Sequence, residues 1–69
     1  MRQKLREQRT KRKLTQKKLA EYLGITTRYY AMIESGDRGG SYQIWDKLET
    51  IFNVPQIELR QNVPRANQD

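Results

Sequence analysis

The residues that usually carry catalytic chemistry are scarce in this chain. Its 69 residues include no histidine and no cysteine, which removes the commonest general base, the commonest nitrogen ligand for metals and every thiolate. The eight acidic residues are scattered from Glu7 to Asp69, and no motif brings two of them together for acid–base work. The sequence therefore predicts a protein that is not an enzyme, with no metal site, no cofactor and no evident small-molecule ligand.

Positive charge is the chemistry that the chain does offer. Lysine and arginine number 14 against eight acids, for a net charge of +6. Residues 1–20 hold nine bases and one acid, or +8, while the other 49 residues hold five bases and seven acids, or −2. Charge gathered at one end suits a polyanion such as DNA, RNA or an acidic membrane surface. It also suits a solvated helix that keeps a small protein soluble, so composition alone leaves both interpretations open.

The length leaves room for one domain with one modest core. We place this domain at residues 1–61 and expect residues 62–69, which have no apolar periodicity, to form a disordered tail. No apolar stretch approaches the ~20 residues of a membrane span, and no apolar run follows the basic N-terminus as it would in a signal peptide. We therefore expect a cytoplasmic protein.

The apolar pattern predicts an all-α fold with five helices, at residues 2–12, 16–23, 27–35, 42–52 and a short segment that Pro55 begins. Thr15, Thr26 and Ser41 are the expected N-caps. Gly24, Gly36 and Asn53 are expected at the C-terminal ends, where left-handed residues belong. The predicted core residues recur at helical spacing: Leu5, Leu19, Ala20, Leu23, Tyr30, Ile33, Ile44, Trp45, Leu48, Ile51 and Phe52. We expect Tyr22 and Tyr42 to cover this core, although both could stack on nucleic acid.

The stretch most typical of a function is residues 15–36, T-Q-K-K-L-A-E-Y-L-G-I-T-T-R-Y-Y-A-M-I-E-S-G. It contains two short predicted helices joined by a tight turn at Gly24, which is free to adopt a positive φ. Ala20 is small enough for the two helices to cross closely. This is the helix-turn-helix design, in which the second helix enters the major groove of DNA.

At these residues the chain resembles the helix-turn-helix domains of phage repressors and Cro proteins. The resemblance covers about residues 4–58 and implies a five-helix, lambda-repressor-like fold. The matching positions are L-T-Q-x-x-L-A-x-x-L-G-I-T from Leu14 to Thr26, Ile33-Glu34-x-Gly36, and a helix opened by Ser41 with Trp45, Leu48 and Phe52.

The resemblance also implies roles for particular side chains. Gln16 resembles a residue that bonds a DNA phosphate, and Arg28 could donate two hydrogen bonds to a guanine. Arg9 and Glu34 match positions that form a buried or half-buried ion pair. The positions implied to contact bases are Thr27, Arg28, Ala31 and Met32. Those implied to contact phosphates are Gln16, Lys17, Thr26, Arg38, Ser41 and Tyr42.

The chain departs from the family pattern at several positions. Lys13 stands where the family usually has glycine, so the end of the first helix is expected to differ. Gly39 and Gly40 replace the usual residues before Ser41, which predicts a looser loop. Tyr29 is expected to face DNA or solvent, whereas Tyr30 is expected in the core.

We interpret the chain as a sequence-specific regulator whose partner is double-stranded DNA with a roughly palindromic operator. The resemblance implies that this regulator is repressor-like. Similar proteins bind as dimers to two half-sites, and we expect a homodimer with its interface around Ile57 and Leu59. Two other classes stay open. One is a protein-interaction adaptor or antitoxin-like modulator, which the absence of acids in residues 27–32 disfavours. The other is a peripheral membrane protein, for which the first helix has too few large apolar residues.

Overall fold

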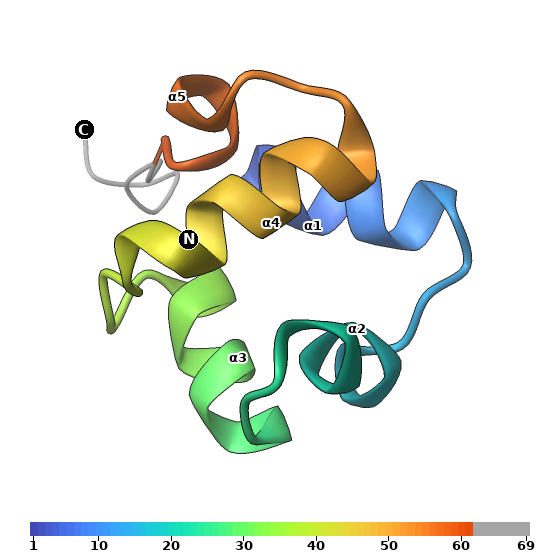
Figure 1. Ribbon diagram of the computed structural model, residues 1–69, viewed down its shortest axis with the longest axis vertical. Helices are drawn as coiled ribbons and strands as arrows, with labels where there is room; N and C mark the ends of the chain where they lie inside the picture. Colours follow the sequence, from blue (N-terminus) through green and yellow to red (C-terminus); the bar gives the residue numbers. More distant parts are fainter. Residues whose placement is uncertain (62–69) are drawn as a thin grey trace, which may run out of the picture.

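The computed structural model describes residues 1–61, and over these residues the chain forms five helices and no strand. The fold is therefore all-helical, as predicted (Figure 1). The tail expected at residues 62–69 lies outside the described residues. The helices are α1 (Gln3–Lys11), α2 (Gln16–Leu23), α3 (Thr27–Ser35), α4 (Tyr42–Phe52) and α5 (Gln56–Leu59).

Three of the helices begin at the predicted hydroxyl caps. The Oγ1 atom of Thr15 accepts a hydrogen bond from the backbone N–H of Lys18 at 3.0 Å, and that of Thr26 accepts one from Tyr29 at 3.0 Å. Ser41 caps α4 in the same way at 3.3 Å. Each cap satisfies a backbone donor that the first turn leaves free and contributes about 1 kcal/mol. The starts of α2, α3 and α4 are thus fixed by local chemistry.

Left-handed residues end the same three helices. Gly24, Gly36 and Asn53 have φ angles of 75°, 97° and 57° after α2, α3 and α4. Gly24 lets the chain turn at once toward α3, and the backbone N–H of Ile25 then donates back to Ala20 at 3.1 Å. The predicted turn of the helix-turn-helix unit is therefore present.

At the end of α1, Lys13 stands at the position where the family usually has glycine, and the structure shows how the backbone accommodates it. Lys13 adopts a φ of 58°, in the left-handed region that favours glycine. Its N–H donates to Thr10 at 2.9 Å, and the N–H of Leu14 donates to Arg9 at 3.1 Å. The lysine therefore keeps the backbone path of a glycine and accepts the strain of a Cβ at positive φ.

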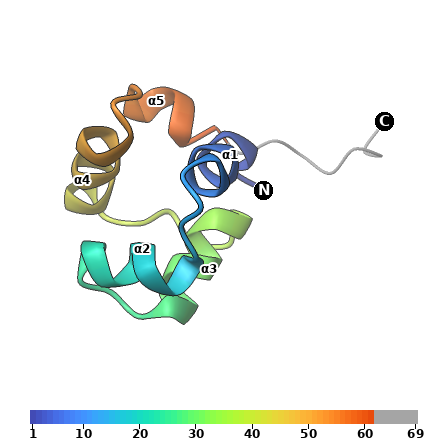
Figure 2. The same cartoon turned by 90° about the vertical axis from the view of Figure 1, so that its right-hand side faces the viewer.

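The core lies where α4 crosses the middle of the molecule, with α2 and α3 on one side of it and α5 on the other (Figure 1). In the perpendicular view of Figure 2, α1 lies beside α5, and α2 and α3 form the opposite layer. This arrangement buries one stripe of each helix. The buried apolar residues are Leu5, Leu19, Ala20, Leu23, Tyr30, Ile33, Ile44, Trp45, Leu48, Phe52 and Leu59.

Two expectations about exposed and buried side chains are wrong. Leu59, expected at a dimer interface, has no exposed surface, because α5 packs against α1 and α4 and turns this side chain inward. Tyr22 and Tyr42, expected to cover the core, are 60% and 71% exposed, because the smaller inward stripe of their helices already fills it. Ile57 stays outside at 74% exposed. Tyr29, expected to face DNA or solvent, is half-buried: it packs against the core and also borders two surface hollows.

Pro55 lies one position earlier than predicted, at the N-cap of α5 and not in its first turn. The side-chain amide of Gln56 donates to Asp46 and Glu49, each at 3.1 Å. These bonds hold the first turn of α5 against α4. None of the helices over residues 1–61 is both long and apolar enough to cross a membrane.

Candidate nucleic-acid interface

The outer face of α3 is set by the residues on its inner face. Tyr30 and Ile33 have no exposed surface and hold α3 against the core. Of the four positions that were predicted to contact bases, Thr27 and Arg28 are exposed, and Ala31 and Met32 are half-buried. None of the four belongs to the fully buried stripe of α3.

A shallow hollow runs along this outer side of α3. Its volume is about 410 Å³. Its walls combine two residues predicted to contact bases with two predicted to contact phosphates, although Arg38 lies beyond the end of the helix. The lining residues are Thr26, Arg28, Tyr29, Met32 and Arg38. The fold thus brings side chains from the N-cap of α3, its middle and the following loop to one concave surface.

A second hollow continues from the first past Tyr29, which lines both. It lies between the turn after α2 and the start of α4, where Ser41 and Gln43 form its polar edge. Ser41 is exposed, and Tyr42 next to it is 71% exposed at the first turn of α4. The first turn of a helix carries free N–H groups that suit an anion.

Gln16 and Lys17 open α2 and are the remaining residues predicted to contact phosphates. Lys17 is exposed. Gln16 is half-buried, and its Nε2 atom donates to Oε1 of Glu34 at 3.0 Å. An amide nitrogen carries two N–H groups, so this bond orients Gln16 and leaves it a further donor.

Glu34 is the centre of a hydrogen-bond network under the interface. Its carboxylate forms a two-pronged ion pair with Arg9, at 2.8 Å to Nε and 3.2 Å to Nη2. It also accepts from the Tyr30 hydroxyl at 2.7 Å and from Gln16. The side chain of Glu34 is 3% exposed and that of Arg9 is 12% exposed. The structure therefore brings together the two residues of the expected ion pair and adds two partners that sequence reasoning missed.

The network shifts the pKa of each of its three ionisable side chains. Burial alone would raise the pKa of Glu34, but the hydrogen bonds from Arg9, Tyr30 and Gln16 outweigh it and the net pKa is lowered. The hydrogen bond with Glu34 raises the pKa of Arg9. Burial, followed by the contact with Glu34, raises the pKa of the Tyr30 hydroxyl. At neutral pH the network therefore holds one carboxylate, one guanidinium and one neutral phenol.

Arg2 has a structural role that the sequence did not reveal. It was counted only as part of the basic end, yet it is 8% exposed. Its Nη1 atom donates to the backbone oxygens of Ile33 at 2.6 Å and Arg38 at 2.9 Å, and its Nε atom donates to Arg60 at 3.1 Å. Burial, and then the nearby charge of Arg60, lowers the pKa of Arg2. Nothing in a single arginine at a chain end signals burial, so no sequence pattern could have found this.

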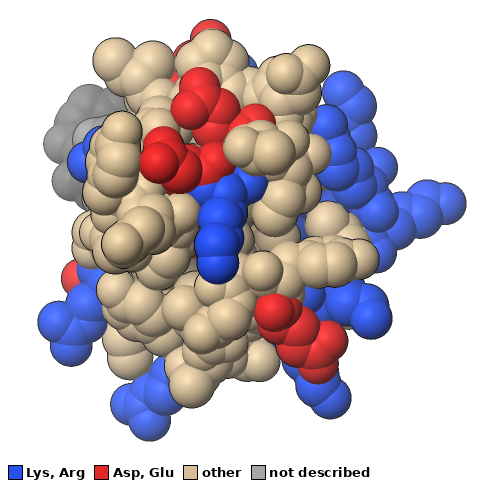
Figure 3. Space-filling view, viewed as in Figure 1, with Lys and Arg blue, Asp and Glu red and all other residues tan. Residues whose placement is uncertain are grey.

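Part of the basic charge at the N-terminal end is therefore used inside the molecule. Arg2 and Arg9 bind internal acceptors, and Arg12 donates to the backbone oxygen of Phe52 at 3.0 Å with its guanidinium 4.9 Å from the ring centre. In Figure 3, lysines and arginines project from the right-hand and lower edges of the face shown, while acids gather in its upper part, over α4 and α5. The upper part of this face is therefore rich in acids, although one Lys or Arg side chain lies directly below them and another acid lies among the bases at the lower right.

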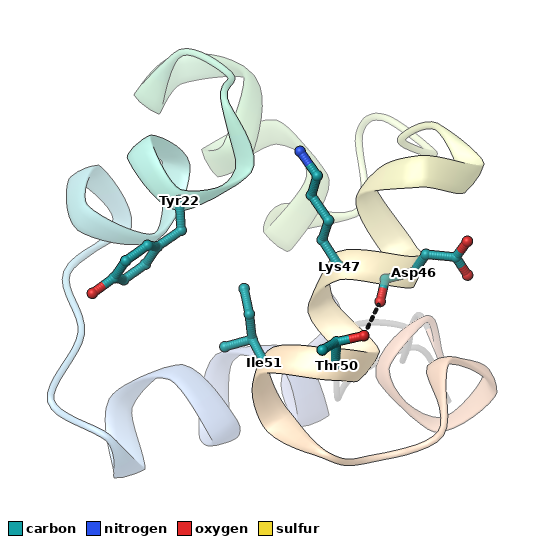
Figure 4. A pocket seen from close by; sticks show the side chains of 5 residues that line it. All are labelled: Tyr22, Asp46, Lys47, Thr50 and Ile51. Carbon is teal, nitrogen blue, oxygen red and sulfur yellow. Dashed lines mark hydrogen bonds between the residues drawn. The ribbon is translucent and has the colours of Figure 1, made fainter.

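A further hollow, of about 370 Å³, lies between α2 and α4, and its walls are mainly apolar (Figure 4). Tyr22 of α2 forms one side, and Lys47 and Ile51 of α4 form the other. The hydroxyl of Thr50 donates to the backbone of its own helix at 3.1 Å and so does not point a free donor into the hollow. This hollow shares no residue with the one along α3. Over residues 1–61 no group of three or more possible ligand side chains could hold a metal ion.

Comparison with known protein families shows which family the chain belongs to. A helix-turn-helix family model matches residues 5–59, which run from the buried Leu5 of α1 to the buried Leu59 of α5. The chain belongs to the helix-turn-helix family. The match spans all five helices, so the resemblance to the domains of phage repressors and Cro proteins holds for the whole fold. Neither the curated proteins nor the solved structures include a match to the chain.

Membership in the helix-turn-helix family supports DNA binding in regulation as the general function of the chain. In this helix-turn-helix domain, α2 and α3 are the two helices of the motif and Gly24 lies in the turn between them. The hollow along α3 therefore lies on the helix that the family design inserts into the major groove.

Proposed function

We propose that this helix-turn-helix domain binds double-stranded DNA sequence-specifically as a repressor-like transcriptional regulator, with α3 in the major groove. The observation that carries the proposal is the shared hollow along α3, in which Thr26, Arg28, Met32 and Arg38 meet on the side facing away from the core. A phage or mobile element is the proposed source of such a small regulator, which would then act in the cytoplasm of the host cell.

Base recognition is assigned to the outward side chains of α3. Arg28 is exposed near the start of the helix and can donate two parallel bonds to O6 and N7 of a guanine. Thr27, Ala31 and Met32 offer a hydroxyl and methyl groups, which suit contact with the methyl group of a thymine. These four residues provide polar and apolar contacts within one helix face, as sequence-specific readout needs.

Phosphate contacts are assigned to the residues around α3. Thr26 and Arg38 border the same hollow, and Ser41 with Tyr42 opens α4 next to it. Gln16 and Lys17 open α2, where the free backbone N–H groups also favour an anion. Contacts of this kind set the register of α3 on the duplex and carry no base preference themselves.

We propose that the domain binds as a homodimer to a roughly palindromic operator. One module of this size buries little surface on DNA, and specific complexes usually combine two half-sites. Leu59 is now excluded from the interface because it is buried, which leaves Ile57 as the apolar side chain that α5 presents to a second copy.

The test is selection from a randomised duplex pool at two salt concentrations, for the wild type and for Arg28→Ala. We expect the wild type to enrich a short, roughly palindromic site, and Arg28→Ala to lose selectivity at one position of each half-site. The matched control is Arg6→Ala, which removes an exposed arginine on α1. This control should enrich the same site as the wild type.

Uniformly weak binding that vanishes with added salt would leave only phosphate attraction and would overturn sequence-specific readout. The protein-interaction adaptor would then be the better assignment. No contact in the structure favours that adaptor at present, because residues 27–32 present no carboxylate beside the hollow along α3.

A further inference from the structure

Arg38 lies in a loop whose backbone is held from both sides. Its N–H donates to the backbone oxygen of Met32 at 3.2 Å, and the N–H of Asp37 donates to the same oxygen at 2.9 Å. On the other side, its carbonyl oxygen accepts from Nη1 of Arg2 at 2.9 Å. The side chain of Arg38 meanwhile lines the hollow along α3. These bonds therefore fix the backbone of Arg38, from which its side chain extends to the hollow.

The next residues of the loop are held by Trp45. The indole N–H donates to the backbone oxygen of Gly39 at 2.7 Å. Gly40 has a φ of 78°, and a Cβ at this position would lie 3.1 Å from the indole nitrogen. This contact would be tight, and the positive φ also favours glycine at this position. The glycine pair, expected to loosen the loop, instead lets it pack against a buried tryptophan.

Arg2 ties this loop to three other parts of the fold. The same Nη1 atom that holds Arg38 also holds the backbone oxygen of Ile33, in the last turn of α3, at 2.6 Å. Its Nε atom holds Arg60 after α5, and its guanidinium lies 5.3 Å from the centre of the Trp45 ring. A rigid guanidinium fork suits this task because it can donate to several carbonyls in fixed directions.

We propose that Arg2 is a positioning residue for DNA binding, which sets the place of Arg38 relative to α3 without contacting DNA itself. The inference rests on the proposed function, because it takes Arg38 as a phosphate contact. Arg2 is 8% exposed, and its Nε and Nη1 atoms donate to backbone carbonyl oxygens of the protein itself. A loop that is ordered before binding does not have to lose its freedom on the DNA, which favours affinity.

A double-mutant cycle on the selected operator tests the proposal, with Arg2→Gln, Arg38→Ala and the double variant. We expect each single variant to weaken binding by about tenfold, and the double variant to be no more than about twofold weaker than Arg38→Ala. Removing one phosphate contact reduces the steepness of log K against log salt by about 0.9. In the double variant this steepness should fall by the amount expected for one lost phosphate contact, and not for two.

A second cycle, which pairs Arg2→Gln with Lys17→Ala, is the matched control. Lys17 lies on α2, away from the carbonyl oxygens that Arg2 holds, so the two losses should multiply. A purely structural role for Arg2 would lower the melting temperature and leave the losses multiplicative in both cycles. All affinities are measured at a temperature where circular dichroism shows each variant folded.

If Arg2→Gln does not fold, Arg2→Lys takes its place in both cycles, since lysine keeps the charge and loses the planar fork. Multiplicative losses with Arg38→Ala, or an unchanged affinity in the Arg2 variant, would overturn the positioning role. An Arg38→Ala variant that binds as tightly as the wild type would overturn it as well. A wild type that selects no operator would instead overturn the proposed function.

Discussion

Glu34 shows how a single buried side chain can couple the core to the proposed interface. Its two oxygens accept hydrogen bonds from Arg9, Tyr30 and Gln16, which come from α1, α3 and α2. Such a charge is tolerated in the core only because each oxygen has partners. Among the described residues that are not exposed, no buried side-chain nitrogen or oxygen lacks a hydrogen-bond partner. The network therefore gives the motif a polar centre that is fully satisfied.

Replacing Glu34 with alanine should lower the free energy of unfolding by about 3–5 kcal/mol, because it leaves the Arg9 guanidinium without its counter-charge in a site that is 12% exposed. Chemical denaturation monitored by circular dichroism measures this loss. Glu7→Ala, which removes an exposed carboxylate on α1, should change it by less than about 0.5 kcal/mol. A Glu34→Ala effect as small as that of the control would contradict the buried ion pair.

Stability should fall with acid in a way that depends on Glu34. The folded state lowers the pKa of Glu34, so the unfolded state takes up the proton first as the pH falls. The stabilisation is complete above the unfolded pKa, about 4.3, and is lost as the pH falls through the lower folded value. Thermal melts from pH 7 to pH 3 should show the advantage of the wild type over Glu34→Gln shrinking below about pH 4.5. A constant difference over this range would show that the pKa is not lowered.

At the residue scale, sequence reasoning found the interface residues that carry a family pattern and missed those that act through geometry. The Arg9 and Glu34 pair was expected because both match motif positions, and the structure brings them together. Gln16 was assigned to a phosphate, but its bond to Glu34 depends on the crossing of α2 and α3. Arg2 gave no signal because its acceptors are backbone oxygens, which every residue has.

At the scale of the helices, most boundaries follow from local rules. The expected bounds of α2, α3 and α4 agree with the structure because a hydroxyl cap and a left-handed residue bracket each of them. α1 is one residue shorter than expected at each end, and the Arg2 side chain makes no capping bond at its start. α5 has only four residues. Its orientation, which buries Leu59, comes from packing that no local rule describes.

The strain at the end of α1 gives a prediction for this helix. Lys13→Gly should raise the free energy of unfolding by about 0.5–1 kcal/mol, because glycine adopts a φ of 58° without the cost of a Cβ, less its greater freedom in the unfolded chain. Denaturant titration measures the change. Lys13→Ala, which removes the charge and keeps the Cβ, should not stabilise the protein. Equal stabilisation by both variants would assign the effect to charge and not to the backbone.

At the scale of the whole molecule, several acids gather on one part of the surface. The hollow along α3 is bordered by Arg28 and Arg38, while the acids of α4 and α5 gather on another part of the surface (Figure 3). Such polarity orients a protein toward a polyanion during approach. The all-α class followed from apolar periodicity in the sequence. The distribution of charge did not, because Arg2 and Arg9 turn inward and Arg12 lies against Phe52.

The proposed dimer makes a prediction at the same scale. Ile57→Asp should leave the melting temperature nearly unchanged, because the side chain is 74% exposed. It should reduce the preference for a duplex with two half-sites over one with a single half-site, which gel-shift titrations measure. Tyr22→Asp, which adds the same charge at another exposed apolar residue, should keep that preference. A preference that survives in Ile57→Asp would place the interface elsewhere.

The environment of Trp45 has an optical consequence. It is the only tryptophan of the chain, 1% exposed, with Gly39 accepting from its indole N–H and the cations of Arg2 and Arg60 at 5.3 and 5.7 Å from its ring centre. The fluorescence of this ring therefore depends on the conformation of the loop that carries Arg38. The intrinsic fluorescence of the unlabelled protein should report unfolding as a red shift, and should report a local opening of the loop as a change in intensity while the helices remain intact.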